Sequence, residues 1–321
     1  MGYTGGVDLG GTKIQTVVVG DGGEVAGQSR RPTPTTGTPA GVAAEIAGAL
    51  KEAAAEAGIA TKQLEGIGVG SPGNVDDDAG TVSAAMNLPG WSGSFNMRKS
   101  LEKSCGAAVR LGNDVQVATD AEFALGSGRP YNSLLGVFWG TGVGGGIVLD
   151  GKPWIGRDVA GEIGHVVVRV GGALCGCGRR GCMEAYAGRA SMEVRARRRA
   201  NRGENTVLFK IMEERGRTRL TSGVWSRALD KGDPLARQLI DRAVRALGTG
   251  IASSQNLLDV EAIVIGGGLG LRLGEPYVER IRDAMMPHLF NDEEPPAIRV
   301  ASLGDLGGAI GASLLVADLR R

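Results

Sequence analysis

Three of the four cysteines in this 321-residue chain lie within a stretch of eight residues. Cys175, Cys177 and Cys182 follow His165, one of only two histidines, in the spacing H-x9-C-x-C-x4-C. One imidazole and three thiolates make the ligand set of a closed tetrahedral zinc site, which leaves no position open for water. We therefore predict that these residues hold a structural Zn²⁺ ion that does no chemistry of its own. The alternative is a set of reduced surface thiols.

Glycine accounts for 55 residues, and three glycine clusters each follow or interrupt an apolar stretch. DLGGTK at residues 8–13 places the carboxylate of Asp8 and the hydroxyl of Thr12 beside a tight turn. GTGVGGG at 140–146 repeats the arrangement, and GGG at 266–268 follows a third apolar run. Backbone N–H groups in such turns bind phosphate oxygens, and a nearby carboxylate can hold Mg²⁺, usually through water. An ordinary hairpin would explain one turn, but three favour a nucleotide site.

Asn113 and Asp114 stand between an apolar stretch that ends at Leu111 and a predicted helix that begins near Val115. A carboxylate at that place is often a helix cap. It is also placed to accept the proton of an attacking hydroxyl group, which is the acid–base task in phosphoryl transfer. The residues alone leave both roles open.

Further polar groups lie in loops after predicted strands, where a rigid scaffold can present them to a ligand. Gly73 belongs to the segment SPG, and Asn87 begins the segment NLPGW. Glu162 and Glu184 flank the cysteine cluster, and each carboxylate can accept hydrogen bonds from two adjacent hydroxyl groups. Plain turn chemistry and solvated surface carboxylates are the alternatives for these four residues.

The elements that must position these groups alternate between strand and helix. Residues 6–9 and 14–19 predict a hairpin around the first glycine turn, and residues 134–149 predict a second hairpin that echoes it. A helix is predicted from Pro39, with Thr38 as its N-cap and Gly58 just past its end. Other strands are predicted at 66–70, 107–111 and 262–265, and helices at 94–104, 114–125, 184–199, 205–215, 222–230, 234–258 and 306–318. The pattern predicts an α/β fold with an internal duplication.

Composition excludes several classes of protein. The 36 lysines and arginines nearly balance 35 aspartates and glutamates, so the formal net charge of +1 gives no global attraction for nucleic acid or anionic membrane. No apolar stretch reaches the ~18–20 residues that span a bilayer, and the first residues lack the pattern of a secretory signal. We therefore expect a cytoplasmic protein with no nucleic-acid or membrane partner.

DLGGTK, GTGVGGG and VIGGGLG, in this order, resemble the two phosphate motifs and the adenosine motif of the actin-like sugar kinases. AGEIGH at 160–165 and CGCGRRGCMEAYAG at 175–188 resemble the signature of one subgroup, the ROK family of repressors, open reading frames and kinases. The resemblance runs from Val7 to about Ala312. It implies two actin-like (ribonuclease H-like) α/β domains, residues 1–115 with 306–321 and residues 116–305, with a nucleotide and sugar cleft between them. The final helix would return to pack on the N-terminal domain.

The resemblance also implies a reaction, the ATP-dependent phosphorylation of a hexose, with glucose to glucose 6-phosphate favoured and Asp114 as general base. ATP and Mg²⁺ would contact Asp8, Gly10, Gly11, Thr12, Lys13, Thr141, Gly142, Gly266, Gly267 and Gly268. The sugar would contact Gly73, Asn87, Asn113, Asp114, Glu162, His165 and Glu184. His165 would bind zinc through one ring nitrogen and the sugar through the other, so zinc would shape the sugar pocket by fixing the loop before Glu184.

Several alternatives remain beside this interpretation. The family also contains sugar-responsive transcriptional regulators, but these carry a DNA-binding helix-turn-helix segment ahead of the first phosphate motif, for which Asp8 leaves no room. Fructose, mannose or N-acetylmannosamine could replace glucose, and polyphosphate could replace ATP. A homodimer is expected because it is usual among relatives. The basic stretch of Arg195, Arg197, Arg198, Arg199 and Arg202 favours a solvated helix face, with nucleic acid or polyphosphate as the alternative partner.

Overall fold

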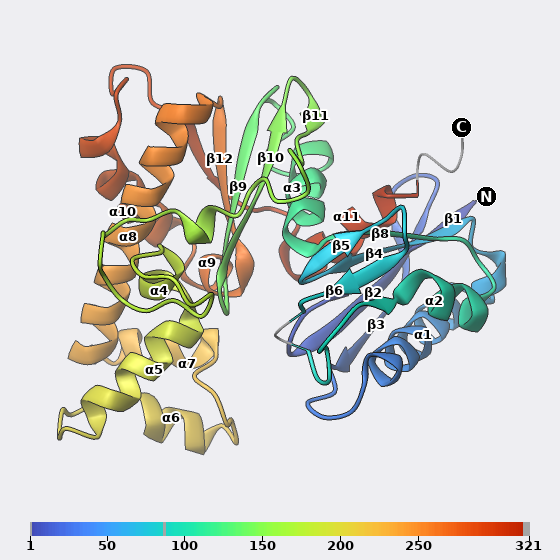
Figure 1. Cartoon of the computed structure of the whole chain (residues 1–321), viewed down its shortest axis with the longest axis horizontal. Helices are drawn as coiled ribbons and strands as arrows, with labels where there is room; N and C mark the ends of the chain where they lie inside the picture. Colours follow the sequence, from blue (N-terminus) through green and yellow to red (C-terminus); the bar gives the residue numbers. More distant parts are fainter. Residues whose placement is uncertain (1, 86–87, 317–321) are drawn as a thin grey trace. The chain divides into compact units, whose positions relative to one another are not determined.

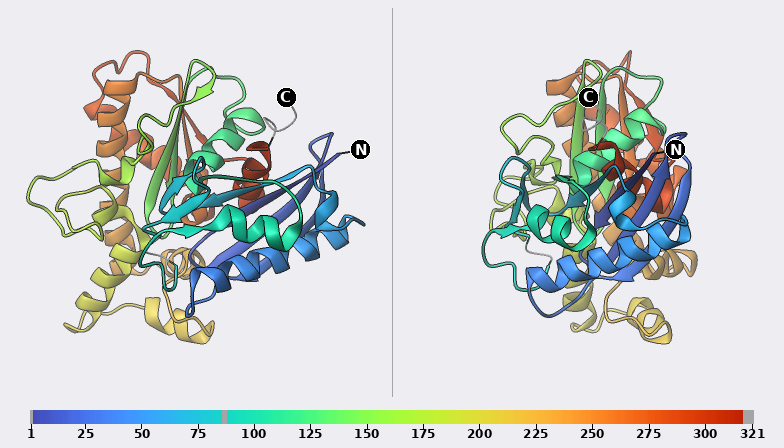
Figure 2. Two further views of the ribbon diagram at one scale, coloured as in Figure 1. Left: turned by 45° about the vertical axis from the view of Figure 1, so that its right-hand side comes forward. Right: turned by 90° about the vertical axis from the view of Figure 1, so that its right-hand side faces the viewer.

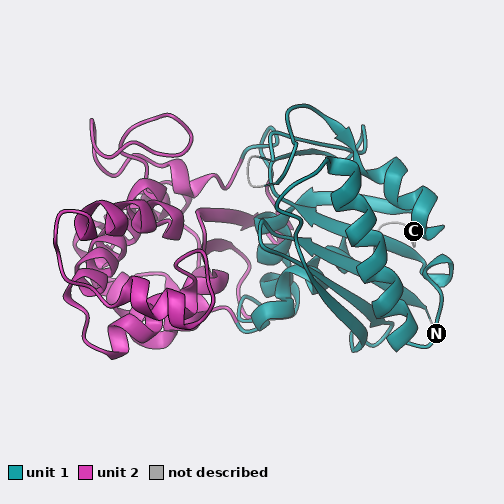
Figure 3. Cartoon of the chain, turned by 90° about the horizontal axis from the view of Figure 1, so that it is seen from below, with its two compact units in different colours: residues 1–129, 155–159, 302–321 teal, residues 130–154, 160–301 magenta. Residues whose placement is uncertain are grey.

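The computed structural model describes residues 2–85 and 88–316. The chain divides into two compact units, coloured teal and magenta in Figure 3. Unit 1 comprises Met1–Arg129, Ile155–Val159 and Ser302–Arg321, and unit 2 comprises Pro130–Trp154 and Ala160–Ala301. Each unit has its own hydrophobic core. The boundaries at residues 115 and 306, which divide the chain into two actin-like domains by its resemblance to a family, stay a prediction.

Unit 1 is built on a five-stranded sheet in the order β3-β2-β1-β4-β8 (Figure 1). β1 (Tyr3–Leu9), β2 (Lys13–Gly20) and β3 (Val25–Pro32) pair antiparallel, and β4 (Gly66–Ser71) and β8 (Val109–Asn113) continue from β1 in parallel. The carboxyl ends of β1, β4 and β8 therefore lie at one edge of the sheet. This carboxyl edge carries the first glycine turn, the SPG loop and the start of the helix after β8.

Helices cover both faces of the unit 1 sheet. α1 (Pro39–Glu56) and α2 (Met97–Cys105) pack together on one face, and α3 (Asp114–Ala124) and α11 (Gly307–Leu314) pack together on the other. α11 approaches the strands very closely, because a Cβ on Gly6 of β1 or on Gly68 of β4 would overlap carbonyl oxygens of this helix. The predicted return of the final helix to the N-terminal sheet is therefore confirmed.

A small antiparallel sheet of β5 (Asn74–Asp76), β6 (Thr81–Ser83) and β7 (Phe95–Asn96) follows β4. Asp77, the residue after β5, ties this sheet to β8. Its carboxylate accepts hydrogen bonds from Arg110 at 2.6 Å and from the N–H of Leu111 at 2.7 Å. The loop that begins at Ser71 is thereby held against the carboxyl edge.

Unit 2 repeats the sheet of unit 1, with the order β11-β10-β9-β12-β13. β9 (Leu134–Trp139), β10 (Val143–Leu149) and β11 (Lys152–Pro153) pair antiparallel, and β12 (Ala262–Gly266) and β13 (Ala297–Val300) continue from β9 in parallel. Each sheet thus has the same sequence of antiparallel and parallel neighbours. This common topology supports the internal duplication that the two hairpins predict.

The helices of unit 2 gather beside its sheet, as the yellow and orange elements of Figure 2 show. They are α4 (Glu184–Ala187), α5 (Arg189–Ala200), α6 (Leu208–Glu214), α7 (Ser222–Asp230), α8 (Pro234–Leu258), α9 (Gly267–Leu273) and α10 (Glu275–Met285). α8 contacts α4, α5, α7 and α10 and is the centre of this layer. Among the described residues, no helix combines the length and apolar character needed to cross a membrane.

The observed elements differ from the predicted ones at several places, and β5, β6, β7 and β13 have no predicted counterpart. The helix predicted over 184–199 is interrupted at Gly188, whose ψ of 129° is extended, so α4 and α5 are separate. The helix predicted from residue 94 begins at Met97, because the Asn96 side chain caps it by accepting the N–H of Lys99 at 2.8 Å. The sequence does not predict β3, since its second half, QSRRP, is polar.

Candidate functional site

The first glycine turn closes the β1–β2 hairpin at the carboxyl edge of the unit 1 sheet. The N–H of Gly10 donates to the Lys13 carbonyl at 2.9 Å, and Thr33 Oγ1 donates to the Gly10 carbonyl at 2.6 Å. Gly11 and Thr12 are exposed. The inner groups of the turn are therefore fixed, while its tip meets solvent as a phosphate-binding turn requires.

Asp8 lies in β1, just before this turn. Burial raises the pKa of its carboxyl group, the charge of Lys13 lowers it, and the charge of Asp305 raises it. Gly308, in the first turn of α11, lies directly against the carboxylate, and a Cβ there would stand 2.9 Å from Asp8 Cγ. A cation bound beside a desolvated carboxyl group favours its ionised form. Asp8 therefore fits a Mg²⁺ ion, held directly or through water.

Lys13, the cation of the turn, is held by the C-terminal part of unit 1. Its Nζ donates to the Asp305 carbonyl at 3.3 Å and lies 3.9 Å from the Asp305 carboxylate. Arg30 lies 3.6 Å from the same carboxylate. No local signal in the sequence points to Asp305, because it stands 292 positions from Lys13.

The start of α3 assigns the capping role that the residues alone left open. Asn113 is the N-cap, and its Oδ1 accepts the N–H groups of Val115 at 3.0 Å and Gln116 at 3.2 Å. Asp114 is the first helical residue, and its Oδ1 accepts the N–H of Val115 at 3.0 Å. The helix is therefore capped by Asn113, and the role of Asp114 as a base stays a prediction. Contact of Asn113 with a sugar also stays a prediction.

Gly73 lies in the loop between β4 and β5, and it has a backbone reason to be glycine. Its φ is +89°, and a Cβ would overlap the carbonyl oxygen of Ser83. Contact of Gly73 with a sugar stays a prediction. Asn87, the other residue predicted in these loops, lies outside the residues that the structure describes.

The second glycine turn joins β9 to β10 in unit 2 and is held by two side chains. Arg189 donates to Thr141 Oγ1 at 2.6 Å, and its backbone N–H donates to the Gly140 carbonyl at 3.2 Å. Glu184 Oε2 accepts the N–H of Val143 at 3.0 Å. Arg189 is a residue that the motifs do not single out, although it follows them directly in the chain.

The third glycine cluster lies next to the second. Gly266 ends β12, and Gly267 and Gly268 begin α9. A Cβ on Gly140 would stand 3.9 Å from the Gly268 nitrogen, and a side chain on Gly142 would overlap the Glu184 carboxylate. Unit 2 thus brings two of the three predicted nucleotide segments together.

The four predicted metal ligands come together in unit 2. One ligand atom from each of His165, Cys175, Cys177 and Cys182 lies within 4.8 Å of the other three. Cys175 Sγ is 3.8 Å from His165 Nδ1, and Cys177 Sγ is 3.8 Å from Cys182 Sγ. A tetrahedral zinc ion with bonds of about 2.3 Å to sulfur has ligand–ligand edges of about 3.8 Å. The donor set and its spacing therefore fit a four-coordinate ion.

The environment of the thiols also suits a cation. Burial raises the pKa of Cys175 to about 12 and raises the pKa of Cys182, whereas the N–H of Arg179 lowers the pKa of Cys177 to about 7. Three neighbouring thiolates would repel one another without a cation. Metal binding displaces thiol protons and removes that repulsion.

Glu162, His165 and Glu184 surround this cluster. His165 directs Nδ1 to Cys175, and its Nε2 lies 3.7 Å from the Glu162 carboxylate. Glu184 Oε1 lies 3.7 Å from Cys175 Sγ, while its other oxygen holds Val143 in the second glycine turn. Glu184 therefore links the cysteine cluster to that turn.

The predicted site residues are divided between the two units. Unit 1 contains Asp8, Gly10, Gly11, Thr12, Lys13, Gly73, Asn113 and Asp114. Unit 2 contains Thr141, Gly142, Glu162, His165, Cys175, Cys177, Cys182, Glu184, Gly266, Gly267 and Gly268. Within each unit, the residues cluster at the glycine turns and the elements that hold them.

Comparison with known proteins relates this arrangement to one family. The family model described as ROK matches residues 4–319. The chain is 33% identical to a glucokinase of Halalkalibacterium halodurans over 97% of this chain and 94% of the relative. It is similar to the crystal structure of a ROK family glucokinase from Streptomyces griseus in complex with glucose and AMPPNP, with a TM-score of 0.84, 33% identity and coverage of 98% and 99%. A ROK hexokinase structure from Thermus thermophilus has a TM-score of 0.77, 35% identity and coverage of 98% and 97%.

Similarity of the same degree extends to kinases named for other sugars. An N-acetylmannosamine kinase of Haemophilus influenzae is 32% identical over 98% of this chain and 95% of the relative. Overall identity therefore does not separate one sugar from another, because a few pocket contacts set that choice.

Proposed function

The chain belongs to the ROK family and is an ATP-dependent hexose kinase, and from this premise we propose that glucose is its substrate and glucose 6-phosphate its product. Support comes from the glucokinase names of several relatives and from the glucose and AMPPNP in the Streptomyces griseus structure. The observation that carries the chemistry is the Asn113–Asp114 pair, in which Asn113 caps α3 and Asp114 opens it.

In the proposed reaction, the 6-hydroxyl of glucose attacks the γ-phosphoryl group of ATP. The bond between the γ-phosphorus and the bridging oxygen of ADP breaks, and Asp114 accepts the hydroxyl proton. A positioned base of this kind contributes about 10²–10⁴-fold to the rate. The glycine turns of both units hold the phosphates through backbone N–H groups, with Lys13 and Thr141 adding a charge and a hydroxyl. Mg²⁺ beside Asp8 would neutralise charge on the phosphates.

Sugar recognition in this proposal uses Gly73, Asn87, Asn113, Asp114, Glu162, His165 and Glu184. Carboxylates and an imidazole suit the task, since they accept hydrogen bonds from the hydroxyl groups of the sugar. A site built to hydrogen-bond a particular hydroxyl strongly rejects a sugar that lacks it.

We also propose that the cysteine cluster binds a structural Zn²⁺ ion. The ion would hold His165 and the loop of Cys175, Cys177 and Cys182 in one arrangement, and Glu184 lies against that loop. With all four positions filled by protein, the ion has no role in the chemical step.

The test is a coupled assay with MgATP and, separately, glucose, fructose, mannose, N-acetylglucosamine and N-acetylmannosamine. We expect the highest kcat/KM with glucose and loss of turnover in Asp114→Asn. Faster turnover of another sugar would correct the substrate, and faster turnover with polyphosphate would correct the donor. Absence of turnover with every sugar would favour the alternative, a sugar-responsive regulator.

A further inference from the structure

The basic stretch at the end of α5 contains arginines in different situations. Arg197 pairs with Glu193 at 2.8 Å, and Arg199 pairs with Glu204. Arg195 forms no ion pair within residues 2–85 and 88–316. The neighbouring residues therefore neutralise part of the stretch, and Arg195 is left with its charge uncompensated.

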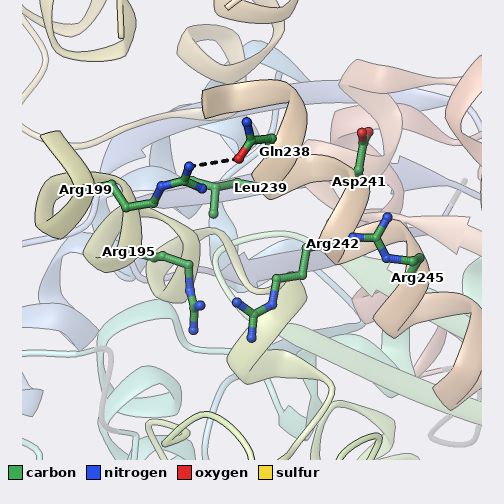
Figure 4. A pocket seen from close by; sticks show the side chains of 7 residues that line it. All are labelled: Arg195, Arg199, Gln238, Leu239, Asp241, Arg242 and Arg245. Atoms are coloured by element: carbon green, nitrogen blue, oxygen red, sulfur yellow. Dashed lines mark hydrogen bonds between the residues drawn. The ribbon is translucent and has the colours of Figure 1, made fainter. Parts of the chain in front are cut away.

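Arg195 and Arg199 line a hollow of about 430 Å³ together with residues of α8 (Figure 4). The other lining residues are Gln238, Leu239, Asp241, Arg242 and Arg245. Four arginines and one aspartate give the lining a formal charge of +3. Asp241 is itself bound by Arg280 at 2.7 Å. In a chain whose total formal charge is +1, this is a strong local concentration of positive charge.

Arg195 of α5 and Arg242 of α8 lie near each other where these two helices pack. Figure 4 shows the side chains of Arg195 and Arg242 extending from these two helices into the same space. Burial, and next the charge of Arg242, lower the pKa of Arg195. Arg242 is positioned by Tyr186, whose ring centre lies 4.5 Å from the guanidinium carbon. Within the described part of the chain, neither Arg242 nor Arg245 has a carboxylate partner.

We propose that this hollow, with Arg195, Arg242 and Arg245 as its ligands, binds the phosphoryl group of a small phosphorylated molecule. Planar guanidinium groups match the oxygens of a phosphate in paired hydrogen bonds. An anion with two or more charges also relieves the mutual repulsion of the arginines. The volume lies in the range of small-molecule pockets, about 300–1,000 Å³.

Two kinds of ligand carry such a phosphoryl group: a phosphorylated sugar and an inorganic phosphate. The enzyme makes a sugar phosphate, so a product-like ligand is present wherever it works. None of the lining residues is assigned to the nucleotide, the sugar or the metal ion. The hollow is therefore a site additional to the one that carries the reaction.

The test compares two double variants with the same change of charge. Arg195→Gln with Arg245→Gln alters the hollow, whereas Arg198→Gln with Arg237→Gln alters exposed arginines of the same two helices that do not line it. Each protein is titrated calorimetrically with glucose 6-phosphate, inorganic phosphate and pyrophosphate at constant ionic strength. AMPPNP and glucose are present throughout to occupy the reaction site.

We expect the wild type and the Arg198/Arg237 control variant to bind the phosphate ligand with the same Kd. The Arg195/Arg245 variant, called the hollow variant, should bind it at least tenfold more weakly. Tightest binding of glucose 6-phosphate identifies a sugar phosphate, and tightest binding of pyrophosphate identifies an inorganic ion. Equal binding by all three proteins overturns the proposal, and so does equal weakening in both variants, which would indicate general charge attraction. The single variant Arg245→Gln, at an exposed position, gives the same comparison if the double variant does not fold.

Binding is read without turnover, so it is independent of the proposed sugar. If glucose fails as a substrate but a phosphate still binds the wild type and not the hollow variant, the inference stands. If glucose is turned over but no phosphate distinguishes the variants, only the inference fails.

Discussion

The two units share one sheet topology but carry different side chains at their glycine turns. In each unit, a glycine turn closes a hairpin. The first strand of this hairpin pairs in parallel with a further strand, which pairs in parallel with one more. In the register of the two hairpins, Leu9 of unit 1 corresponds to Trp139 of unit 2, so Asp8 corresponds to Phe138. The common topology thus supplies a glycine turn twice, while a carboxylate at this position occurs in unit 1 alone.

The turns also differ in what holds them. In unit 1, Lys13 is held by Asp305 from the C-terminal end of the chain. In unit 2, Glu184 and Arg189 hold the turn from the segment directly after the cysteine cluster. The two glycine turns are therefore held by segments outside their own hairpins, and these segments differ between the units.

The loops of the two units are secured by different chemistry as well. In unit 1, the buried Glu122 accepts the N–H groups of Ser127, Ser302 and Leu303 at 3.0, 3.0 and 2.8 Å, and both serine hydroxyls donate to it. These residues flank the points where the chain passes between the units. In unit 2, His165 and the three cysteines come together from separate parts of one loop segment. One unit uses a carboxylate with many donors, and the other gathers one imidazole and three thiols.

The largest expected effect is in unit 1, on the chemical step. Asp114→Asn should lower kcat by about 10²–10⁴-fold with little change in KM for the sugar, because the amide cannot accept the proton. Asp120→Asn on the same helix is the matched control and should keep kcat. Steady-state kinetics of both variants measure this. Retention of more than a tenth of kcat in Asp114→Asn would exclude it as the base.

The next effect is expected in unit 2. Removal of zinc by chelation, or Cys177→Ser, should lower kcat/KM for the sugar by about 10–100-fold, because the loop beside Glu184 loses its fixed arrangement. Hydrogen exchange should rise over residues 163–188 and stay unchanged over β1 and β2. Cys105→Ala serves as the control, since this thiol lies outside the cluster. Full activity of protein shown by metal analysis to be zinc-free would contradict the prediction.

A smaller effect is expected for the carboxylate that secures unit 1. Glu122→Gln places an NH₂ group among N–H donors, so at least one donor to this buried side chain loses its acceptor. The free energy of unfolding should fall by about 2–3 kcal/mol, against about 0.5–1 kcal/mol for Ser127→Ala, which removes one donor only. Denaturant unfolding of both variants gives the comparison. Equal losses would show that Glu122 is not the common acceptor.

The smallest effect concerns pH. Burial raises the pKa of Asp120 to about 7, with a hydrogen bond from Gln116 acting in the opposite direction. The folded protein then binds the proton more tightly than the unfolded chain, so stability falls as pH rises from about 4 to 7. Each pKa unit is worth about 1.4 kcal/mol, and partial exposure reduces the total to about 1–2 kcal/mol.

Asp120→Asn should remove this part of the pH dependence and make the protein more stable than the wild type at pH 8. Thermal unfolding at several pH values measures it. An unchanged pH profile would mean that Asp120 is ionised in the folded protein without cost.

Many elements of the fold were predictable because their signals are local. α7 and α8 have the predicted bounds, and α8 begins where Pro234 follows Asp233, whose side chain caps it by accepting the N–H of Ala236 at 2.7 Å. Thr38 caps α1 as predicted. Gly188, by contrast, ends α4 through an extended conformation that the helical pattern around it does not reveal.

The amino-acid sequence by itself determined the features whose parts lie close together in the chain. These are the glycine turns, the start of α3 at Asp114, and the cysteine cluster, whose spacing brings four donors together once the loop folds. Such features depend on backbone geometry over a few residues.

Only the tertiary structure decided which distant groups meet. It paired Lys13 with Asp305, gave Glu122 its donors at Ser302 and Leu303, and placed Arg242 beside Arg195. The physical reason is that charge compensation and burial depend on the packing of whole elements, and no spacing along the chain records which elements will pack together.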